Sequence, residues 1–234
     1  MSGLGGHRVL VTGAAQGLGA AIARAFAEAG AAPVLLDRDG PALASLADAL
    51  GAEAHAVDLA DAAALGAVLD GLGPVETLIH NAGLLRPASI EDTDLALFDA
   101  TMNVGIRAGY QLARALWPGM RAAGGGAMVF VSSQSGIRGF EDETAYCAAK
   151  HALEGFSKCL ALEGAAHGIL SCTITPGKPM RTPMSEANYP PELKAEWIDP
   201  IRLAPAFLGI ARGRDMSLSG RRLNAWEMSQ AARP

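Results

Sequence analysis

Residues 12–19 read Thr12-Gly13-Ala14-Ala15-Gln16-Gly17-Leu18-Gly19, and they join a strand-like segment, His7–Thr12, to a helix-like one, Gly17–Ala29. Glycines allow a tight turn here and let backbone N–H groups approach a phosphate at the helix N-terminus. Such a cluster could be only a turn between strand and helix, but it occupies the position that a dinucleotide-binding motif requires. The predicted cofactor contacts in this stretch are Gly13, Gln16, Gly17, Leu18 and Gly19.

Short apolar runs alternate with longer Ala- and Leu-rich segments along the whole chain. The predicted strands are His7–Thr12, Pro33–Asp37, Glu53–Val57, Val75–His80, Ala127–Ser132, Leu170–Thr175 and Arg221–Ala225. The predicted helices are Gly17–Ala29, Pro41–Leu50, Ala62–Leu72, Asp94–Ala122, Ala145–Ala166 and Pro205–Arg212. Several strands are almost continuously apolar, which is typical of a parallel sheet covered on both faces. We expect one α/β domain over residues 1–234, a doubly wound, Rossmann-type parallel sheet of about seven strands.

The composition excludes several classes of function. Half of the 234 residues are hydrophobic, 18% are charged and 28 are glycine, which suits a compact enzyme better than a disordered or repeat protein. A net charge of −5 gives no basic footprint for nucleic acid. The cysteines and histidines show no metal-like spacing, and no apolar run approaches the ~18 residues of a membrane span. We therefore expect no metal, no nucleic-acid partner and no membrane insertion, and a cytoplasmic location.

The second predicted strand ends in a carboxylate, Asp37, 18 residues after Gly19. This spacing suits an acid that accepts hydrogen bonds from the adenosine ribose, expected ~20 residues after the turn. A carboxylate there also repels a 2′-phosphate, so Asp37 favours NAD over NADP. Gln16 and Arg38 complicate this preference, because an arginine at the strand end can hold that phosphate. An ordinary strand-end or helix-capping acid is the alternative.

Tyr146 and Lys150 are four residues apart on a predicted helix, and Ser133 follows a predicted strand. Residues at this helical spacing share a face. Lowering the pKa of a tyrosine from ~10 to neutrality needs ~4 kcal/mol. A lysine ammonium at ~4 Å supplies about that much if the effective dielectric constant is ~20. The pair could serve as a general base toward an alcohol or carbonyl oxygen, although the same spacing also arises by chance on solvated helices.

Together these segments resemble the short-chain dehydrogenase/reductase family over nearly the whole chain. The motifs that carry the resemblance are the turn Thr12–Gly19, Asn81-Ala82-Gly83, Asn103, the set Ser133, Tyr146 and Lys150, and Pro176-Gly177. The resemblance implies that Tyr146 exchanges a proton with the substrate oxygen and that Ser133 orients that oxygen. Lys150 would lower the tyrosine pKa and bind the nicotinamide ribose. Asn103 would hold a water in a proton relay, unless its side chain only bonds helix backbone.

The resemblance also implies further cofactor contacts. Asp58, followed by Leu59, would meet the adenine, although a helix N-cap is an alternative for Asp58. Asn81, Ala82 and Gly83 would shape the strand end beside the cofactor, with Pro176, Gly177 and Thr182 on the nicotinamide side. Two departures from the family pattern stand out: the segment after Pro176-Gly177 is one residue longer, and the C-terminus lacks the usual Gly-Gly.

The function implied is hydride transfer between NAD and a small to medium secondary alcohol or ketone, with the hydride chemistry supplied by the cofactor. The alternatives are an NADPH-dependent reductase of 3-oxoacyl or other ketones and a dinucleotide-binding regulator without turnover. Residues 178–198 are expected to form a substrate lid. The helix that holds Tyr146 is apolar nearly all round, which favours a homodimer or homotetramer, with a thick core within one monomer as the alternative.

Overall fold

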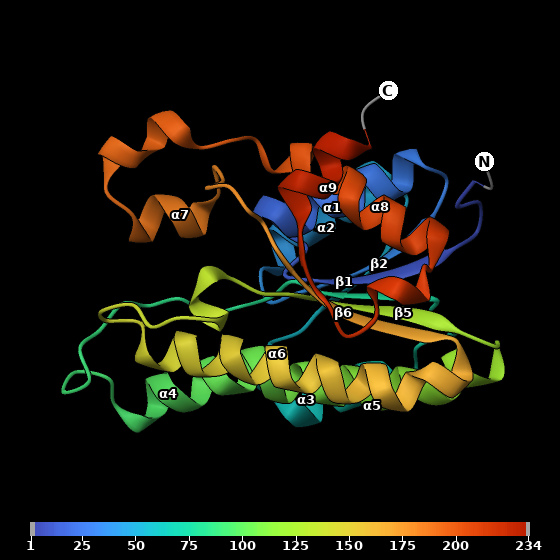
Figure 1. The fold of residues 1–234 in the computed structure, drawn as a ribbon, viewed down its shortest axis with the longest axis horizontal. Coiled ribbons are helices and arrows are strands. Elements are labelled where there is room, and N and C mark those ends of the chain that lie inside the picture. The colour runs from blue at the N-terminus through green and yellow to red at the C-terminus, as the bar shows by residue number, and fades with distance from the viewer. Residues whose placement is uncertain (1–2, 233–234) are drawn as a thin grey trace.

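The computed structural model describes residues 3–232, and all seven of its strands join one parallel sheet. The strand order is β3-β2-β1-β4-β5-β6-β7, so the chain reverses direction across the sheet after β3 (Figure 1). The strands are β1 (Arg8–Thr12), β2 (Ala32–Asp37), β3 (Glu53–Ala56), β4 (Thr77–His80), β5 (Gly126–Val131), β6 (Ile169–Thr175) and β7 (Arg222–Asn224). The predicted fold class is confirmed, and the predicted strand ends differ by a residue or two.

Helices cover both faces of this sheet (Figure 1). They are α1 (Gly17–Glu28), α2 (Gly40–Leu50), α3 (Ala62–Asp70), α4 (Leu95–Met102), α5 (Ala108–Ala122), α6 (Thr144–Gly164), α7 (Pro183–Asn188), α8 (Ala204–Gly213) and α9 (Ala225–Ala231). The sheet divides two cores because side chains alternate along a strand. Val9 and Val11 of β1 pack with Phe26 of α1, whereas Leu10 packs with Leu112 of α5 on the opposite face.

Side-chain caps define where the helices of the first half begin. The carboxylates of Asp39, Asp61 and Asp94 accept hydrogen bonds from the first-turn amides of α2, α3 and α4. At its other end α2 stops at Gly51, whose φ of 61° is left-handed. These caps set the residues at which α2, α3 and α4 begin after their preceding strands or loops.

The predicted helix over Asp94–Ala122 is present, because the chain is helical from Leu95 to Ala122, but it is not a regular α-helix throughout. Helix α4 passes into a π-helical segment, Asn103–Arg107, before α5 begins. The carbonyl of Gly105 in this segment accepts a hydrogen bond from the buried imidazole of His80, 2.7 Å away. Gly105 also lies so close to α6 that an added Cβ would stand 3.0 Å from the Cβ of Ala149. The widened turn therefore lets the helix satisfy His80 while it stays packed against α6.

Short helices in the last quarter of the chain were not predicted. Helix α7 is capped by Thr182, whose hydroxyl accepts from the amide of Ser185, and α9 is capped by Asn224, the last residue of β7. Segments of one or two turns hold too few residues for a hydrophobic period to show. Within residues 3–232, no helix is long and apolar enough to cross a membrane.

Candidate active site

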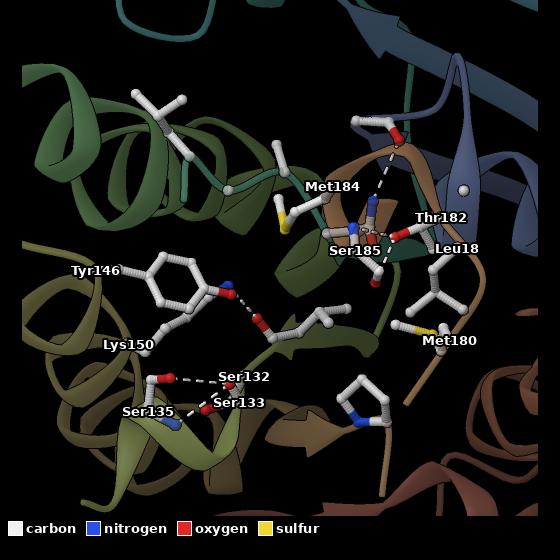
Figure 2. A pocket seen from close by; sticks show the side chains of 18 of the residues that line it. Leu18, Ser132, Ser133, Ser135, Tyr146, Lys150, Met180, Thr182, Met184 and Ser185 are labelled. Atoms are coloured by element: carbon white, nitrogen blue, oxygen red, sulfur yellow. Dashed lines mark hydrogen bonds between the residues drawn. The ribbon is translucent and has the colours of Figure 1, made fainter. Parts of the chain in front are cut away.

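A cavity of about 530 Å³ opens at the carboxyl ends of the strands, beside the point where the strand order reverses. Ligands of doubly wound sheets bind at this place. Figure 2 shows Tyr146 and Lys150 on one wall and Met180, Met184 and Thr182 on the opposite one. Most of the predicted cofactor contacts line this cavity, namely Gly13, Gln16, Gly17, Leu18, Asp37, Asp58, Leu59, Asn81, Ala82, Gly83, Tyr146, Lys150, Pro176, Gly177 and Thr182.

The turn after β1 is shaped by glycine and held by an asparagine. Gly13 and Gly17 have φ angles of 63° and 56°, which few residues other than glycine adopt. The side-chain amide of Asn81 donates to the carbonyl oxygens of Thr12 and Gly13 at 3.0 and 3.1 Å. Gly19 does not line the cavity; a Cβ there would overlap the carbonyl oxygen of Gly13. Its absent side chain instead lets α1 start directly against the turn.

A buried histidine supports the neighbouring strand end. Nδ1 of His80 accepts from the hydroxyl of Thr12 at 3.0 Å, while that oxygen accepts from the amides of Asn81 and Ala82 at 3.1 Å each. Burial lowers the pKa of His80 to about 4, so the ring is neutral and its other nitrogen donates to Gly105. No sequence pattern indicated a role for His80, because its contact with Gly105 depends on the π segment.

Asp37 and Asp58 both reach the cavity, and neither caps a helix. The two oxygens of Asp37 accept from the amides of Ala15 and Asp39, each at 3.0 Å, so the carboxylate links β2 to the glycine turn. One oxygen of Asp58 accepts from the amide of Ala60 at 2.9 Å. Because Asp39 caps α2 and Asp61 caps α3, the capping alternatives for Asp37 and Asp58 are wrong.

Ser133, Tyr146 and Lys150 meet in one wall of the cavity. The ammonium nitrogen of Lys150 lies 5.4 Å from the centroid of the Tyr146 ring and donates to the carbonyl of Val131 at 2.7 Å. The hydroxyl of Ser133 accepts from the amide of Ser135 and donates to its hydroxyl, both at 3.2 Å. The structure thus brings together the three side chains that the sequence analysis grouped.

The predicted lowering of the tyrosine pKa by Lys150 is not seen in the chain without a bound cofactor. Burial raises the pKa of Tyr146 above its ordinary value of 10, and the neighbouring Tyr189 and Glu143 add to that increase. Burial also lowers the pKa of Lys150, from 10.5 to about 8. The ammonium is held by the Val131 carbonyl, so desolvation of the phenolate outweighs the attraction of one cation. A neutral phenol is therefore the resting state.

Asn103 lies where α4 gives way to the π segment, and it does not line the cavity. Its side chain is half-buried and makes no hydrogen bond within residues 3–232, so the alternative of a backbone-bonding residue is wrong for this structure. The water relay implied by the family resemblance stays a prediction.

Residues of the segment 178–198 line one side of the cavity, and the role of this segment as a substrate lid stays a prediction. The two ends of this segment are joined by backbone hydrogen bonds, from Arg181 to Ile198 at 2.9 Å and from Ile198 to Pro179 at 3.0 Å. Its members that line the cavity include Met180, Met184, Tyr189, Leu193 and Trp197. Thr182 touches the glycine turn, because a Cβ at Gly17 would lie 3.2 Å from its methyl group.

The loop Gln134–Glu143 was expected to form the wall opposite residues 178–198, but Glu143 itself was given no role, and it proves to be a charged residue of the cavity wall. Its side chain is buried, and one carboxylate oxygen accepts from the hydroxyl of Ser135 at 2.7 Å. Its charge acts on the phenols of Tyr146 and Tyr189. The sequence offers only a weak signal for this role, an acid just before the helix that carries the tyrosine. Within residues 3–232, no group of His, Cys, Asp and Glu side chains could hold a metal ion.

Comparisons with known proteins agree with this site. The family model for short chain dehydrogenase matches residues 7–192. D-threitol dehydrogenase of Mycolicibacterium smegmatis is 37% identical over 74% of this chain and 70% of its own. L-xylulose reductase of Mus musculus is 39% identical over 83% and 80%. A candidate NAD(P)-dependent gluconate 5-dehydrogenase from Beutenbergia cavernae, solved with NADP at low occupancy, superimposes with a TM-score of 0.88 at 28% identity, over 96% and 98% of the two chains.

The matched residues include the glycine turn, four of whose residues line the cavity, and Ser133, Tyr146 and Lys150, which line it as well. The chain therefore belongs to the short chain dehydrogenase family and is an NAD(P)-dependent oxidoreductase.

Proposed function

We propose that the protein transfers a hydride between NAD(H) and a secondary alcohol or ketone of small to medium size, with Tyr146 as the general acid/base. The observation that supports this most is that Ser133, Tyr146 and Lys150 line the same cavity as the glycine turn and Asp37. A substrate oxygen at the Tyr146 end would lie in the compartment that also takes the dinucleotide.

In the direction of oxidation, the phenolate of Tyr146 would take the proton of the alcohol, and a bound nicotinamide would supply the hydride acceptor. Ser133 holds the substrate oxygen beside the phenol. The ammonium of Lys150, which bonds the Val131 carbonyl in the chain by itself, would stabilise that phenolate and would hold the ribose of a bound cofactor. Asn103 would pass the proton to solvent through a water. In the direction of reduction, the neutral phenol that burial favours donates the proton.

The preference for NAD rests on the Asp37 carboxylate. Both of its oxygens are held at the strand end by amides of the turn and of Asp39, so the negative charge cannot swing away from a 2′-phosphate. Arg38, exposed at the rim of the same cavity, is the observation that favours the second candidate, an NADPH-dependent ketone reductase. The NADP in the related gluconate 5-dehydrogenase candidate also supports that alternative.

For the substrate, we propose a secondary alcohol that carries a neighbouring hydroxyl. The relatives include a threitol dehydrogenase and L-xylulose reductases, whose names describe polyols and sugars. Glu143 supplies a carboxylate to the wall of the cavity beside Tyr146, and it can accept a hydrogen bond from a second hydroxyl. The lid adds an apolar surface through Met180 and Met184.

A homodimer or homotetramer is part of the proposal. Tyr110 of α5 is 54% exposed and Leu162 of α6 is 81% exposed, and these two helices lie along one outer face of the molecule (Figure 1). Apolar side chains on a helix face favour contact with a second copy. Light scattering tests this proposal, and a monomeric mass at micromolar concentration would contradict it. The cytoplasmic location stays a prediction.

The function is tested in two steps. Purified protein is titrated with NADH and NADPH while its intrinsic fluorescence is followed, and secondary alcohols and polyols are then screened with NAD by the absorbance of the reduced nicotinamide. We expect tighter NADH binding and turnover of vicinal diols or polyols. Tighter NADPH binding would overturn the role of Asp37. Binding without turnover of any alcohol or ketone would support the regulator instead.

A further inference from the structure

Glu154 is a buried acid to which the proposed chemistry gives no part. It lies on α6 four residues after Lys150 and eight after Tyr146, so all three side chains share the helix face that meets the strand ends. Its side chain is only 10% exposed. A carboxylate is costly to bury unless donors and a cation surround it.

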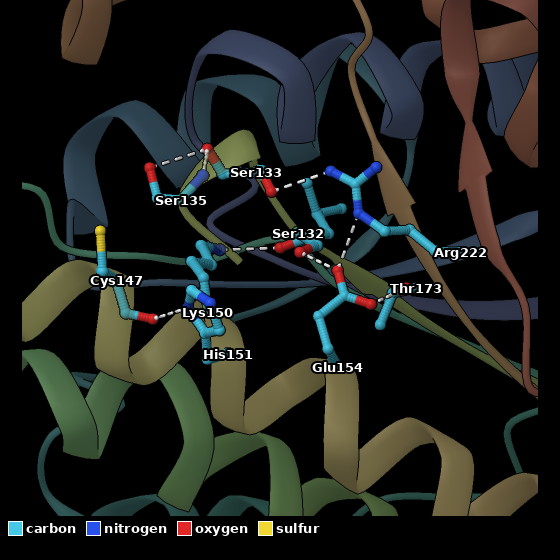
Figure 3. Close-up of polar contacts among 10 residues, drawn as sticks. Ser132, Ser133, Ser135, Cys147, Lys150, His151, Glu154, Thr173 and Arg222 are labelled. Carbon is cyan, nitrogen blue, oxygen red and sulfur yellow. Dashed lines mark hydrogen bonds and ion pairs between the residues drawn. The ribbon is translucent and has the colours of Figure 1, made fainter. Parts of the chain in front are cut away.

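The carboxylate of Glu154 is bonded by donors from three successive strands or their ends. One oxygen accepts from the hydroxyl of Ser132, after β5, at 2.5 Å and from Nε of Arg222, on β7, at 3.1 Å. The other accepts from the hydroxyl of Thr173, on β6, at 2.7 Å. Figure 3 shows Arg222 between this carboxylate and the backbone of Ser133, whose carbonyl accepts from its Nη2 at 3.0 Å.

These contacts hold three consecutive residues at the end of β5. Lys150 binds the carbonyl of Val131, Glu154 binds the hydroxyl of Ser132, and Arg222 binds the carbonyl of Ser133. We propose that Glu154 and Arg222 form a positioning pair, which holds Ser133 against α6 beside Tyr146 and supplies the counter-charge to the Lys150 ammonium. The proposal rests on the proposed function, because it concerns residues that act through Ser133 and Lys150.

The charges around Lys150 determine how the pair should act on the pH profile. Lys150 faces Tyr146 and Glu154 from its own helix, His80 from β4, and Arg222 beyond Glu154 from β7. Of these groups, Glu154 opposes the effect of burial, because its negative charge raises the pKa of Lys150. Removing that charge should let Lys150 lose its proton at lower pH, and with it the stabilisation of the phenolate.

A purely structural pair would stabilise the fold without affecting catalysis. A neutral pair can be as stable as a buried ion pair, whereas removal of one partner leaves an unpaired buried charge. Stability and catalysis should therefore separate in a set of variants. Glu154→Gln keeps the shape and loses the charge. Arg222→Lys keeps the charge, but an ammonium group lacks the planar guanidinium whose separate N–H groups donate to both the Glu154 carboxylate and the Ser133 carbonyl. The double variant Glu154→Gln/Arg222→Met removes both charges.

The experiment measures four quantities for each variant: the urea midpoint, the Kd of NADH, kcat, and the pH profile of kcat. We expect Glu154→Gln to move the alkaline limb of the kcat profile to lower pH by about half a unit or more. Arg222→Lys should lower kcat by about tenfold while the Kd of NADH stays within about twofold, since neither residue touches the cofactor cavity. Glu163→Gln, an exposed acid on the same helix, is the matched control and should leave all four unchanged.

The double variant separates the two explanations. If the pair positions Ser133, the urea midpoint should return toward that of the wild type while kcat stays low. Recovery of kcat together with stability would overturn the proposal, as would a wild-type pH profile and kcat in Glu154→Gln and Arg222→Lys. If Glu154→Gln alone yields too little folded protein, the double variant still decides. Failure of the wild type to oxidise any alcohol counts against the proposed function instead.

Discussion

Replacement of Asp37 by asparagine should change the cofactor preference by a calculable amount. A carboxylate and a 2′-phosphate ~5 Å apart repel by ~3 kcal/mol at an effective dielectric constant of ~20, and by under ~1 kcal/mol in water. Asp37 is half-buried at the edge of the cavity, so about 2 kcal/mol is appropriate. Asp37→Asn should therefore bind NADPH about 30-fold more tightly than the wild type does.

The same substitution should weaken the binding of NADH, because a neutral amide oxygen accepts hydrogen bonds from the ribose hydroxyls less strongly than a carboxylate does. The difference of about 1 kcal/mol corresponds to about fivefold in the Kd of NADH. The ratio of the two dissociation constants should thus change by roughly 100-fold. Asparagine has one carbonyl oxygen in place of two, so it can keep the bond from Ala15 or the bond from Asp39 but not both. We expect a loss of about 1 kcal/mol in unfolding free energy.

Fluorescence titrations with NADH and NADPH measure both dissociation constants and so the ratio between them. Asp39→Asn is the matched control, because Asp39 carries the same charge two residues away but caps α2. Its ratio should stay within about twofold of the wild type. If Asp37→Asn left the ratio unchanged, or if Asp39→Asn shifted it equally, the contact between Asp37 and the ribose would be refuted.

Three further predictions concern the site and its support. Burial lowers the pKa of Lys150 to about 8, whereas in the unfolded chain it is about 10. Between pH ~8 and pH ~10, Lys150 is therefore deprotonated in the folded chain and still protonated in the unfolded one. The unfolding free energy should consequently rise with pH across that window, by up to ~3 kcal/mol, and urea titrations of Lys150→Met should lack the rise. Glu143→Gln should raise KM for a vicinal diol about tenfold and leave a matched mono-alcohol unchanged, and equal effects on both would contradict the assignment. Gly19→Ala should destabilise the chain by about 3 kcal/mol and weaken NADH, because the new methyl group overlaps the Gly13 carbonyl; a wild-type urea midpoint would count against this reasoning.

Local patterns in the sequence predicted the sheet and the grouping of Ser133, Tyr146 and Lys150 at one cavity. The apolar runs gave the strands, the glycine spacing gave the turn, and the four-residue spacing placed Tyr146 and Lys150 on one face of α6. What could not be predicted depends on contacts between distant segments. The π segment accompanies the bond of His80 to Gly105, and the partial burial of Tyr146 depends on the distant segments that line the same cavity. Both depend on tertiary contacts, which a short stretch of sequence does not reveal.

The C-terminal departure from the family pattern illustrates the same point. The lack of Gly-Gly after β7 marked this region as unusual but indicated no structure. In the fold, Asn224 caps the short helix α9. Two residues earlier, Arg222 reaches back to Ser133 and Glu154, 89 and 68 residues away along the chain. The four-residue step from Lys150 to Glu154 was visible in the sequence; its partner on β7 was not.

The central claim is that Tyr146 exchanges the proton with the substrate. Its most direct test compares kcat and the Kd of NADH for Tyr146→Phe and for Tyr189→Phe, which alters the other tyrosine of the cavity. Loss of a general acid/base costs about 10²–10⁴-fold in rate. We predict that Tyr146→Phe lowers kcat by at least ~100-fold with the Kd of NADH within about twofold of the wild type, whereas Tyr189→Phe retains most of its turnover. A kcat for Tyr146→Phe within about tenfold of the wild type would contradict the account.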